Sequence, residues 1–395
     1  MNEGIKKILG GRKKGTNNLM QFTLAIELLV VFVLFQVLTD GLFLSSRNFS
    51  NLIMQGCVFA ILSVAMLLVM VTCNIDLSTG AAVGFLGMLA ATLQVKAGFG
   101  TLATILITLI AGLLIGAWNG FWISYIKLPA FIATLAGQFA FQGLTLLLSN
   151  GVSIGPMDES FSFIGSAYLP SLFVKDSEIS DTSIIILGIF IVVFILLSLK
   201  SRRQQMKYGL VLSSKKAFYG KMAIVVLAIL AIGFKLIDYR GIPYAVLLLF
   251  LIAVIVNFVS KNTPFGRYIY AIGGNMDAAK LSGIKVEKVL MGIYLMMGLI
   301  TAIASIVFLG RVGQATASGG IGFEFNAITG CIVGGASTMG GQGGVVGAIL
   351  GAILMAALDN GMQLLNLSSA YQYIIKGLVL LLAVAIDVLS KRSKE

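Results

Sequence analysis

The chain alternates long apolar runs with short polar segments over most of its length. A helix needs about 20 apolar residues to cross the hydrocarbon core of a bilayer. The sequence predicts twelve such segments, several of which could be short, bent or re-entrant: Leu19–Leu38, Leu52–Cys73, Leu77–Val95, Leu102–Ile126, Ala130–Ser149, Ser183–Leu199, Met222–Ile237, Pro243–Val259, Val289–Leu309, Phe323–Thr338, Val345–Leu365 and Ala370–Leu389. We therefore expect an all-α, polytopic membrane protein with roughly 10–12 transmembrane segments.

The composition supports this class. Of 395 residues, 58% are hydrophobic and only 11% are charged, against about 25% charged in a soluble domain. The chain has no histidine, which removes histidine-based triads, metal ligands and proton relays. Its three cysteines, Cys57, Cys73 and Cys331, lie in or at the ends of apolar runs. They indicate small apolar side chains rather than a disulfide frame, and no metal site is expected.

The positive charges predict the orientation. The chain has 28 lysines and arginines, of which 21 fall in segments that share one side if the N-terminus is inside: residues 1–18, Lys127, 200–221, 260–288 and the tail after 390. Only six fall on the other side. Cytoplasmic loops of membrane proteins are enriched in Lys and Arg, so both termini are expected to be cytoplasmic. An even number of crossings is then needed, which favours a crossing by Phe323–Thr338. The charge of +12 follows this membrane pattern and gives no reason to expect nucleic acid.

We interpret 1–395 as a single transmembrane domain with four polar segments: a cytoplasmic basic N-terminus (1–18), an external loop (150–182), a cytoplasmic basic loop (200–221) and a second cytoplasmic loop (260–288). The external loop carries five carboxylates, at 158, 159, 176, 178 and 181, against Lys175 alone. It is either a docking rim for an external partner or a solvated connector.

Two glycine arrays predict close helix packing. Gly112, Gly116 and Gly120 recur at four-residue spacing, and so do Gly343, Gly347 and Gly351. Small residues at this spacing give a flat helix face that lets backbones approach in lipid. An Asn-Gly pair accompanies each array, at Asn119 and Asn360, which is a weak sign of repeated halves.

The sequence contains no phosphate-binding loop of its own. The nearest match, Gly10–Asn17, has Thr16 where a lysine is needed to reach the phosphates. Any ATP must be hydrolysed elsewhere, and this stretch is interpreted as a basic anchor.

Polar residues at membrane depth are costly and suggest function. Asp76 either binds a ligand or caps the following helix, and the two roles are compatible. Trp118 beside Asn119 offers the stacking face and the amide that suit a sugar ring, although a packed core Trp explains it equally well. The candidates for a substrate path are Asn74, Asp76, Ser78, Trp118, Asn119, Asn326, Asn360 and Gln363.

Asp359 and Lys376 flank the turn between the last two apolar segments at similar depth. In an antiparallel hairpin they would lie level, and mutual neutralisation would lower the cost of burial. We expect a structural ion pair. The alternative is that Lys376 extends to the surface.

The segment Thr263–Ile284 is polar, glycine-punctuated and amphipathic, so it must face water or another protein. Together with Asn74–Gly80, Leu128–Ala136, Ile328–Gly344 and Tyr371–Gly377, it resembles the membrane permease of ABC-type simple-sugar importers, the ribose, xylose and galactose group. The resemblance covers most of residues 50–390.

This resemblance implies that 263–284 is the coupling segment received by an ATPase subunit. Its candidate residues are Gly266, Arg267, Gly273, Asn275, Ala278, Ala279, Lys280, Leu281, Ser282 and Gly283. The implied assembly has two permease copies, two ATP-binding subunits that hold ATP and Mg²⁺, and an extracytoplasmic sugar-binding protein, in a bacterial inner membrane. No cofactor is expected in this chain. Asp359 departs from the family pattern, which has asparagine there in many members. The extra length around 150–240 favours the xylose type or a broader monosaccharide range.

Two other functions are less well supported. An ion-coupled secondary transporter of a small polar solute would use Glu27, Asp76, Glu324 and Asp359 as ion sites, but it gives the segment 263–284 no role. A membrane-embedded enzyme lacks a nucleophile–base pair or a ligand set.

Overall fold

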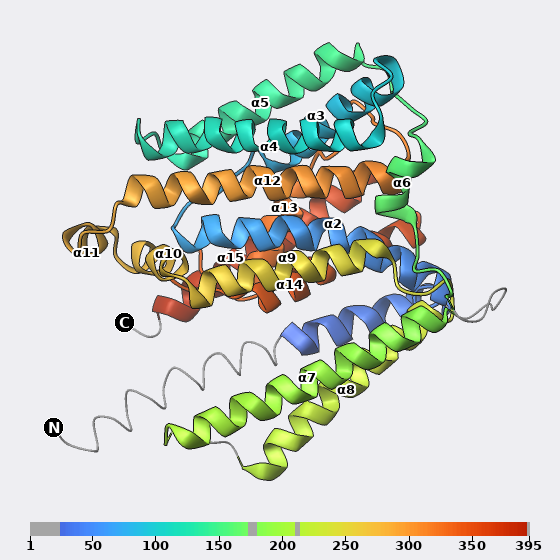
Figure 1. The fold of residues 1–395 in the computed structure, drawn as a ribbon, viewed down its shortest axis with the longest axis vertical. Helices are drawn as coiled ribbons and strands as arrows, with labels where there is room; N and C mark the ends of the chain where they lie inside the picture. Colours follow the sequence, from blue (N-terminus) through green and yellow to red (C-terminus); the bar gives the residue numbers. More distant parts are fainter. Residues whose placement is uncertain (1–23, 173–179, 210–213, 393–395) are drawn as a thin grey trace. The chain divides into compact units, whose positions relative to one another are not determined.

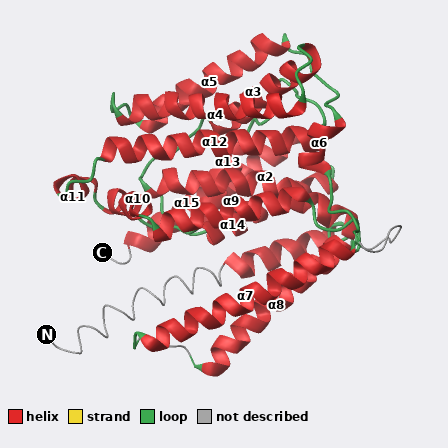
Figure 2. Ribbon diagram, viewed as in Figure 1, coloured by secondary structure: helices red, strands yellow, loops and turns green. Residues whose placement is uncertain are grey.

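The chain folds almost entirely into helices (Figures 1 and 2). The computed structural model describes residues 24–172, 180–209 and 214–392. Its helices are Leu24–Leu38, α2 (Ser46–Val71), α3 (Thr79–Ala91), a π-helical turn (Thr92–Lys96), α4 (Thr101–Ser124), α5 (Ala130–Ser149), α6 (Glu159–Ser166), α7 (Asp181–Lys207), α8 (Lys215–Ile237), α9 (Tyr244–Asn262), α10 (Pro264–Gly274), α11 (Met276–Leu281), α12 (Val286–Val312), α13 (Phe323–Val333), α14 (Val345–Leu364) and α15 (Ser369–Arg392).

The all-helical prediction is confirmed. Within the described ranges there are two isolated β-bridges and no strand. Ten helices are long and apolar enough to cross a membrane, and Leu24–Leu38 and α13 are shorter apolar helices. The predicted basic N-terminus (1–18), and Lys175, Asp176 and Glu178 of the predicted external loop, lie outside the described residues.

The chain divides into two compact units. Unit 1 comprises residues 1–43, 52–166 and 245–395, and unit 2 comprises 44–51 and 167–244. In unit 1, α2 is the central helix, and its side chains from Leu52 to Val71 are almost all buried. The ribbon shows α10 and α11 at one end of this bundle and α6 at the other (Figure 1).

The first glycine array forms a close backbone contact between two helices of unit 1. A Cβ added to Gly112 would overlap Ala302 and the carbonyl oxygen of Gly298, and one added to Gly116 would overlap the carbonyl oxygen of Tyr294. The backbones of α4 and α12 therefore touch, as the four-residue spacing predicts. The second array is confirmed in part. Gly347 and Gly351 press on α13 in the same way, but Gly343 precedes α14.

The predicted helix Phe323–Thr338 is wrong in its length. Helix α13 ends at Val333, and Gly335, at φ 90°, turns the chain out of the helix. Eleven residues rise about 16 Å, roughly half of a hydrocarbon core.

Loops complete the path of this segment across unit 1. Ala315 pairs with Ile154 beside α6, and Gly341 N–H donates to the Val71 carbonyl at 2.8 Å beside α10. The segment 313–344 thus joins the two ends of the bundle, mostly in non-helical form. Such backbone is tolerated at membrane depth where protein or a polar cavity surrounds it.

Unit 2 is a helical hairpin, α7 and α8, tied at its base. The Leu169 N–H donates to Ile242 O at 3.0 Å, and Tyr244 N–H donates to Ala167 O at 3.1 Å. The Ser183 hydroxyl accepts from Ile242 N–H at 3.0 Å. These bonds hold together the two points at which the chain enters and leaves the unit.

We predict that Gly298→Ala lowers the thermal unfolding midpoint of the purified protein, because the added Cβ overlaps the Gly112 carbonyl oxygen. Overpacking of this kind costs about 1–3 kcal/mol, which offsets the gain of about 1 kcal/mol that alanine brings to a helix. Gly143→Ala is the matched control because no atom lies within 4 Å of its added Cβ, and it should keep or raise the midpoint. Equal shifts in the two variants would contradict the proposed backbone contact.

Candidate functional site

A polar turn separates α2 from α3 inside unit 1. The carboxylate of Asp76 accepts the backbone N–H of Ser78 at 2.9 Å and the Ser78 hydroxyl at 2.6 Å. This is an Asx-type turn, in which a short acidic side chain replaces the missing backbone partner. Asp76 is only 3% exposed. Asp76 thereby orders Ser78, the N-cap residue of α3, whose own side chain makes no capping bond, so the predicted cap of the following helix is not formed by Asp76 itself.

Two neighbouring helices complete this cluster. The Asn119 amide of α4 donates to the Ser78 hydroxyl at 2.8 Å. From α5, the Thr134 hydroxyl accepts the Leu77 N–H at 3.2 Å and donates to Ala130 O at 2.8 Å. The sequence did not single out Thr134 as a site residue, although it lies within the motif Leu128–Ala136. The predicted residues Asp76, Ser78 and Asn119 thus meet in one buried cluster.

A second buried cluster joins α13, α14 and α15. The Lys376 ammonium lies 2.8 Å from one carboxylate oxygen of Asp359 and 2.9 Å from the other. The Asn326 amide donates to the same carboxylate at 3.1 Å. Asp359 is buried, and the Lys376 side chain is 20% exposed. The sequence pairs Asp359 with Lys376 but does not place Asn326 beside them.

Helix α13 touches both clusters. Near its start, the Glu324 carboxylate lies against Gly80 of α3, close enough that a Cβ on Gly80 would overlap it. Two residues on, Asn326 binds Asp359 of α14. Both side chains are buried. Glu324 had no predicted partner in the sequence, because nothing in its spacing indicates a glycine 244 positions earlier.

Three of these side chains, and that of Tyr294 in α12, keep a polar atom without a partner. Among the described residues, Asn119 Oδ1, Tyr294 OH, Glu324 Oε2 and Asn326 Oδ1 are buried without a hydrogen-bond partner. Buried polar atoms are rarely left unpaired in proteins, and each one calls for an explanation such as water or a ligand. Hydroxyl-rich molecules are well suited to pair with amide and carboxylate oxygens.

The remaining path candidates lie elsewhere. Asn74 is partly buried, and its amide donates to the Thr72 carbonyl and hydroxyl, both at 3.1 Å. Asn360 is buried next to Asp359. Trp118 is 52% exposed and packs edge to face on Trp122, and Gln363 is exposed. Trp118 and Gln363 are therefore not part of either buried cluster.

The segment predicted to couple folds as two short capped helices. Thr263 caps α10, with its hydroxyl accepting Gly266 N–H at 3.2 Å, and Pro264 occupies the first turn. Asn275 caps α11, accepting Ala278 N–H at 2.9 Å. Gly283, at φ 83°, follows α11 and turns the chain toward α12. The two caps explain why this polar segment is ordered into helices at all.

Helix α10 is packed tightly on the bundle. Ile269 and Ile272 are buried, and a Cβ on Gly273 would overlap the Val71 carbonyl oxygen. Gly266 presses likewise on the backbone of Ser260. The Tyr270 hydroxyl donates to Gly343 O at 3.0 Å, and burial raises the pKa of this phenol above its usual value. At neutral pH Tyr270 therefore remains a hydrogen-bond donor.

Helix α11 projects from the bundle. Leu281 is 90% exposed, and Arg267, Ala278, Lys280, Ser282 and Gly283 are also exposed. We predicted from the sequence that Ala279 contacts the ATPase, but in the structure this side chain is buried within the chain itself. Lys280 lies 3.9 Å from Asp277, an exposed pair that adds little stability.

A glycine-rich loop, residues 334–344, connects α10 to the buried clusters. Its Gly341 N–H binds the Val71 carbonyl, its Gly343 carbonyl binds Tyr270, and the Thr338 hydroxyl donates to Asp387 of α15 at 2.8 Å. The Cys73 thiol donates to the Met339 carbonyl at 3.0 Å. The loop continues backwards into α13, which carries Glu324 and Asn326. The sequence quoted this stretch as a motif but did not predict its contact with α10.

The comparisons with known proteins agree with this architecture. The family described as "Branched-chain amino acid transport system / permease component" matches residues 48–384. The chain is 41% identical over 375 residues to the xylose transport system permease protein of Haemophilus influenzae, covering 95% of this chain and 98% of the relative. It is 40% identical to the Escherichia coli K12 xylose permease, covering 95% and 93%. The E. coli K12 ribose import permease is 31% identical, covering 93% and 94%. No solved structure matches.

We predict that Lys376→Gln strongly destabilises the protein, because it leaves the buried Asp359 carboxylate without its cation. Removing one partner of a buried pair costs about 3–5 kcal/mol, and the partial exposure of Lys376 places this one at roughly 3 kcal/mol. Asp359→Asn combined with Lys376→Gln should recover most of the loss, measured as the unfolding midpoint in detergent. A double variant no more stable than Lys376→Gln alone would show that the pair has no structural role.

Proposed function

Because the chain belongs to the family of branched-chain amino acid transport system / permease components, we propose that it is the translocation subunit of an ATP-driven monosaccharide importer. The observation that carries the proposal is the full-length identity of about 40% to xylose permeases, against 31% to a ribose permease. Xylose is therefore the first candidate substrate, and a broader pentose or hexose range is the second. The role of the chain is passage of a solute rather than catalysis.

The proposed assembly is the one implied by the resemblance to simple-sugar ABC importers, and it is consistent with the lack of a phosphate-binding loop in the sequence. Two copies of the chain form the path, two ATP-binding subunits hold ATP and Mg²⁺, and a sugar-loaded binding protein docks on the outer side. The positive charges of 200–221 and 260–288 support a cytoplasmic position for α10 and α11. The same rule supports a cytoplasmic position for both termini. The similarity to bacterial permeases supports the inner membrane of a bacterium.

We propose that α11 is the part of the chain that the ATPase grips. Leu281 supplies an apolar anchor, and Lys280 and Arg267 supply charge beside it. Motion of α11 passes to α10. Gly273 of α10 is already in contact with the backbone of Val71 and Gly341, so α10 cannot move without displacing them. From there the loop 334–344 leads to α13. A displacement at the ATPase is thereby transmitted to Glu324 and Asn326.

The sugar path is proposed to run past the two buried clusters. Asp76, Ser78 and Asn119 line one side, and Asn326 and Asn360 line the other. The unpaired oxygens of Asn119, Glu324 and Asn326 suit the hydroxyls of a neutral sugar. Asp359 holds the Asn326 amide through a hydrogen bond. Because Lys376 neutralises Asp359, this pair adds no net charge to the path. Asn74, Trp118 and Gln363 are proposed to contact sugar only at other points of the path or at the junction of two copies.

Uptake into proteoliposomes tests the function. Vesicles that carry the permease, its ATPase and the binding protein should accumulate labelled xylose only when ATP is supplied to the ATPase side. A panel of pentoses and hexoses, scored by stimulation of ATP hydrolysis, identifies the sugar. Uptake that continues without the ATPase and collapses with a protonophore would instead support the ion-coupled alternative that uses Glu27, Asp76, Glu324 and Asp359.

We predict that Leu281→Asp reduces the ATPase that co-purifies with the tagged permease by roughly tenfold, the scale of an interface anchor. The unfolding midpoint of the permease should not change, because the side chain is almost fully exposed. Phe163→Asp is the control, a half-exposed aromatic on α6 at the other end of unit 1. Loss of the ATPase with Phe163→Asp but not with Leu281→Asp would reverse the proposed sidedness.

A further inference from the structure

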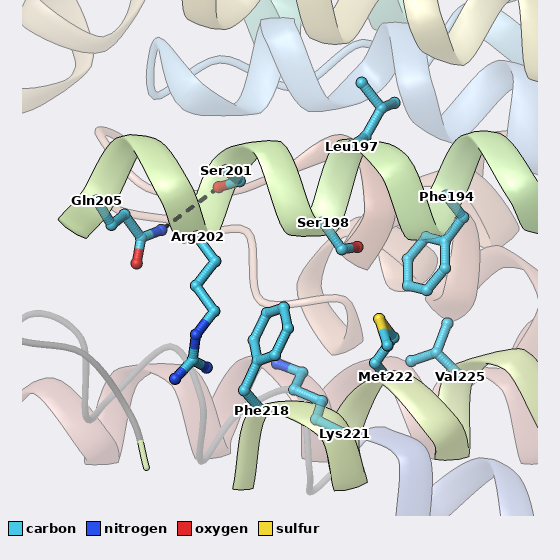
Figure 3. A pocket seen from close by; sticks show the side chains of 10 residues that line it. All are labelled: Phe194, Leu197, Ser198, Ser201, Arg202, Gln205, Phe218, Lys221, Met222 and Val225. Carbon is cyan, nitrogen blue, oxygen red and sulfur yellow. Dashed lines mark hydrogen bonds between the residues drawn. The ribbon is translucent and has the colours of Figure 1, made fainter. Parts of the chain in front are cut away.

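A cleft of about 540 Å³ lies between α7 and α8 within unit 2. Ten residues line it: Phe194, Leu197, Ser198, Ser201, Arg202, Gln205, Phe218, Lys221, Met222 and Val225. Figure 3 shows Phe194, Met222 and Val225 at one end, Arg202 and Gln205 at the other, and Phe218 and Lys221 between them. The cleft is therefore apolar along one part and cationic along the other.

The charge around the cleft has one sign. Residues 182–237 contain no aspartate or glutamate, while residues 200–221 contain seven lysines and arginines. Two of these, Arg202 and Lys221, line the cleft from opposite helices. The Arg202 guanidinium lies over the Phe218 ring of α8, 4.4 Å from its centroid, which fixes the cation across the cleft. A molecule bound there gains most if it is an anion.

The position of the cleft along α7 matches a membrane–water boundary. Arg202 lies 21 residues beyond Asp181, the first residue of α7. At 1.5 Å per residue this is about 32 Å, close to the roughly 30 Å thickness of the hydrocarbon core. Arg202 thus lies at the level of lipid phosphates, and Phe194 lies more than two helical turns deeper, at the level of the acyl chains.

The helices that form the cleft carry exposed apolar side chains along most of their length, as expected of helices that face lipid. Large apolar side chains such as Ile189, Val192 and Leu196 of α7, and Leu227 and Phe234 of α8, are about half exposed or more. An acyl chain can therefore enter the apolar part of the cleft directly from the bilayer. A soluble anion would use only the cationic part and would leave Phe194, Met222 and Val225 uncovered.

We propose that this cleft binds one anionic glycerophospholipid of the leaflet that faces the basic end of the hairpin. The phosphate lies between Arg202 and Lys221, and the hydroxyls of Ser198 and Ser201 lie beside the glycerol region. An acyl chain packs along Phe194, Met222 and Val225. Basic pockets between transmembrane helices are a known way to hold acidic headgroups. The lipid would act as a third element of the hairpin, joining α7 to α8.

The test compares two double variants of equal charge by native mass spectrometry of the full chain in mild detergent. Arg202→Gln with Lys221→Gln removes the two cations of the cleft. Arg203→Gln with Lys216→Gln removes two exposed cations of the same basic end that do not line it. Phosphatidylglycerol, phosphatidylcholine and inorganic phosphate are the probes.

We expect the unaltered chain and the Arg203/Lys216 variant to retain one phosphatidylglycerol and little phosphatidylcholine. The Arg202/Lys221 variant should retain roughly thirtyfold less phosphatidylglycerol than that control, since two cations are removed and each contributes about 1 kcal/mol to binding of an acidic headgroup. Added phosphatidylglycerol should also raise the unfolding midpoint of the control variant and not that of the cleft variant.

Three results would overturn the proposal. Equal lipid loss in both variants would mean that general positive charge, not the cleft, attracts the lipid. Equal retention of phosphatidylcholine would mean that the headgroup charge is not recognised. Displacement of phosphatidylglycerol by millimolar inorganic phosphate would mean that the cleft takes a free anion.

Discussion

The architecture depends on how closely helix backbones can approach inside a bilayer. Lipid tails are as apolar as leucine, so helices gain little from hiding apolar side chains and must associate through van der Waals contact. Glycine makes this contact possible. Gly112 and Gly116 bring the α4 backbone onto α12, and Gly330, Gly334, Gly347 and Gly351 do the same for α13 and α14. These contacts fix the frame in which the buried polar groups of Asp76, Asn119 and Asn326 can be held.

The same close packing gives α10, part of the proposed coupling segment, a tight connection to the interior of unit 1. Helix α10 has no spare volume around Gly273, and the loop 334–344 that it touches is anchored to Val71, Cys73, Tyr270 and Asp387. A loop of this composition is flexible when isolated, because glycine has the largest conformational freedom. Here its contacts restrict it to one path. A displacement of α10 would therefore move the loop 334–344 as well. The glycines of the loop would allow its backbone to adopt a second conformation when that happens.

The all-helical class and the approximate number of spans were predictable from sequence because they rest on local signals, namely the length and composition of each apolar run. Apolar length predicts spans, whereas the caps Thr263 and Asn275, which divide the segment 263–284 into two short helices, became evident only in the structure. The partners of buried groups were less predictable, since they depend on contacts between residues distant in sequence. Asp359 and Lys376 were paired because one turn separates them, whereas Glu324 with Gly80, and Tyr270 with Gly343, have no sequence signal. The excess length assigned to Phe323–Thr338 arose because hydropathy does not register the two glycines that end α13.

The base of the α7–α8 hairpin has a consequence for the length of its helices. The segments before α7 and after α8 are hydrogen-bonded to each other at Leu169–Ile242 and Ala167–Tyr244. The hairpin therefore begins and ends at nearly the same point. Closing a loop whose ends are already joined costs little more as the loop grows. A change in the length of α7 and α8 would therefore leave the two attachment points where they are, and with them the path of the chain through unit 1.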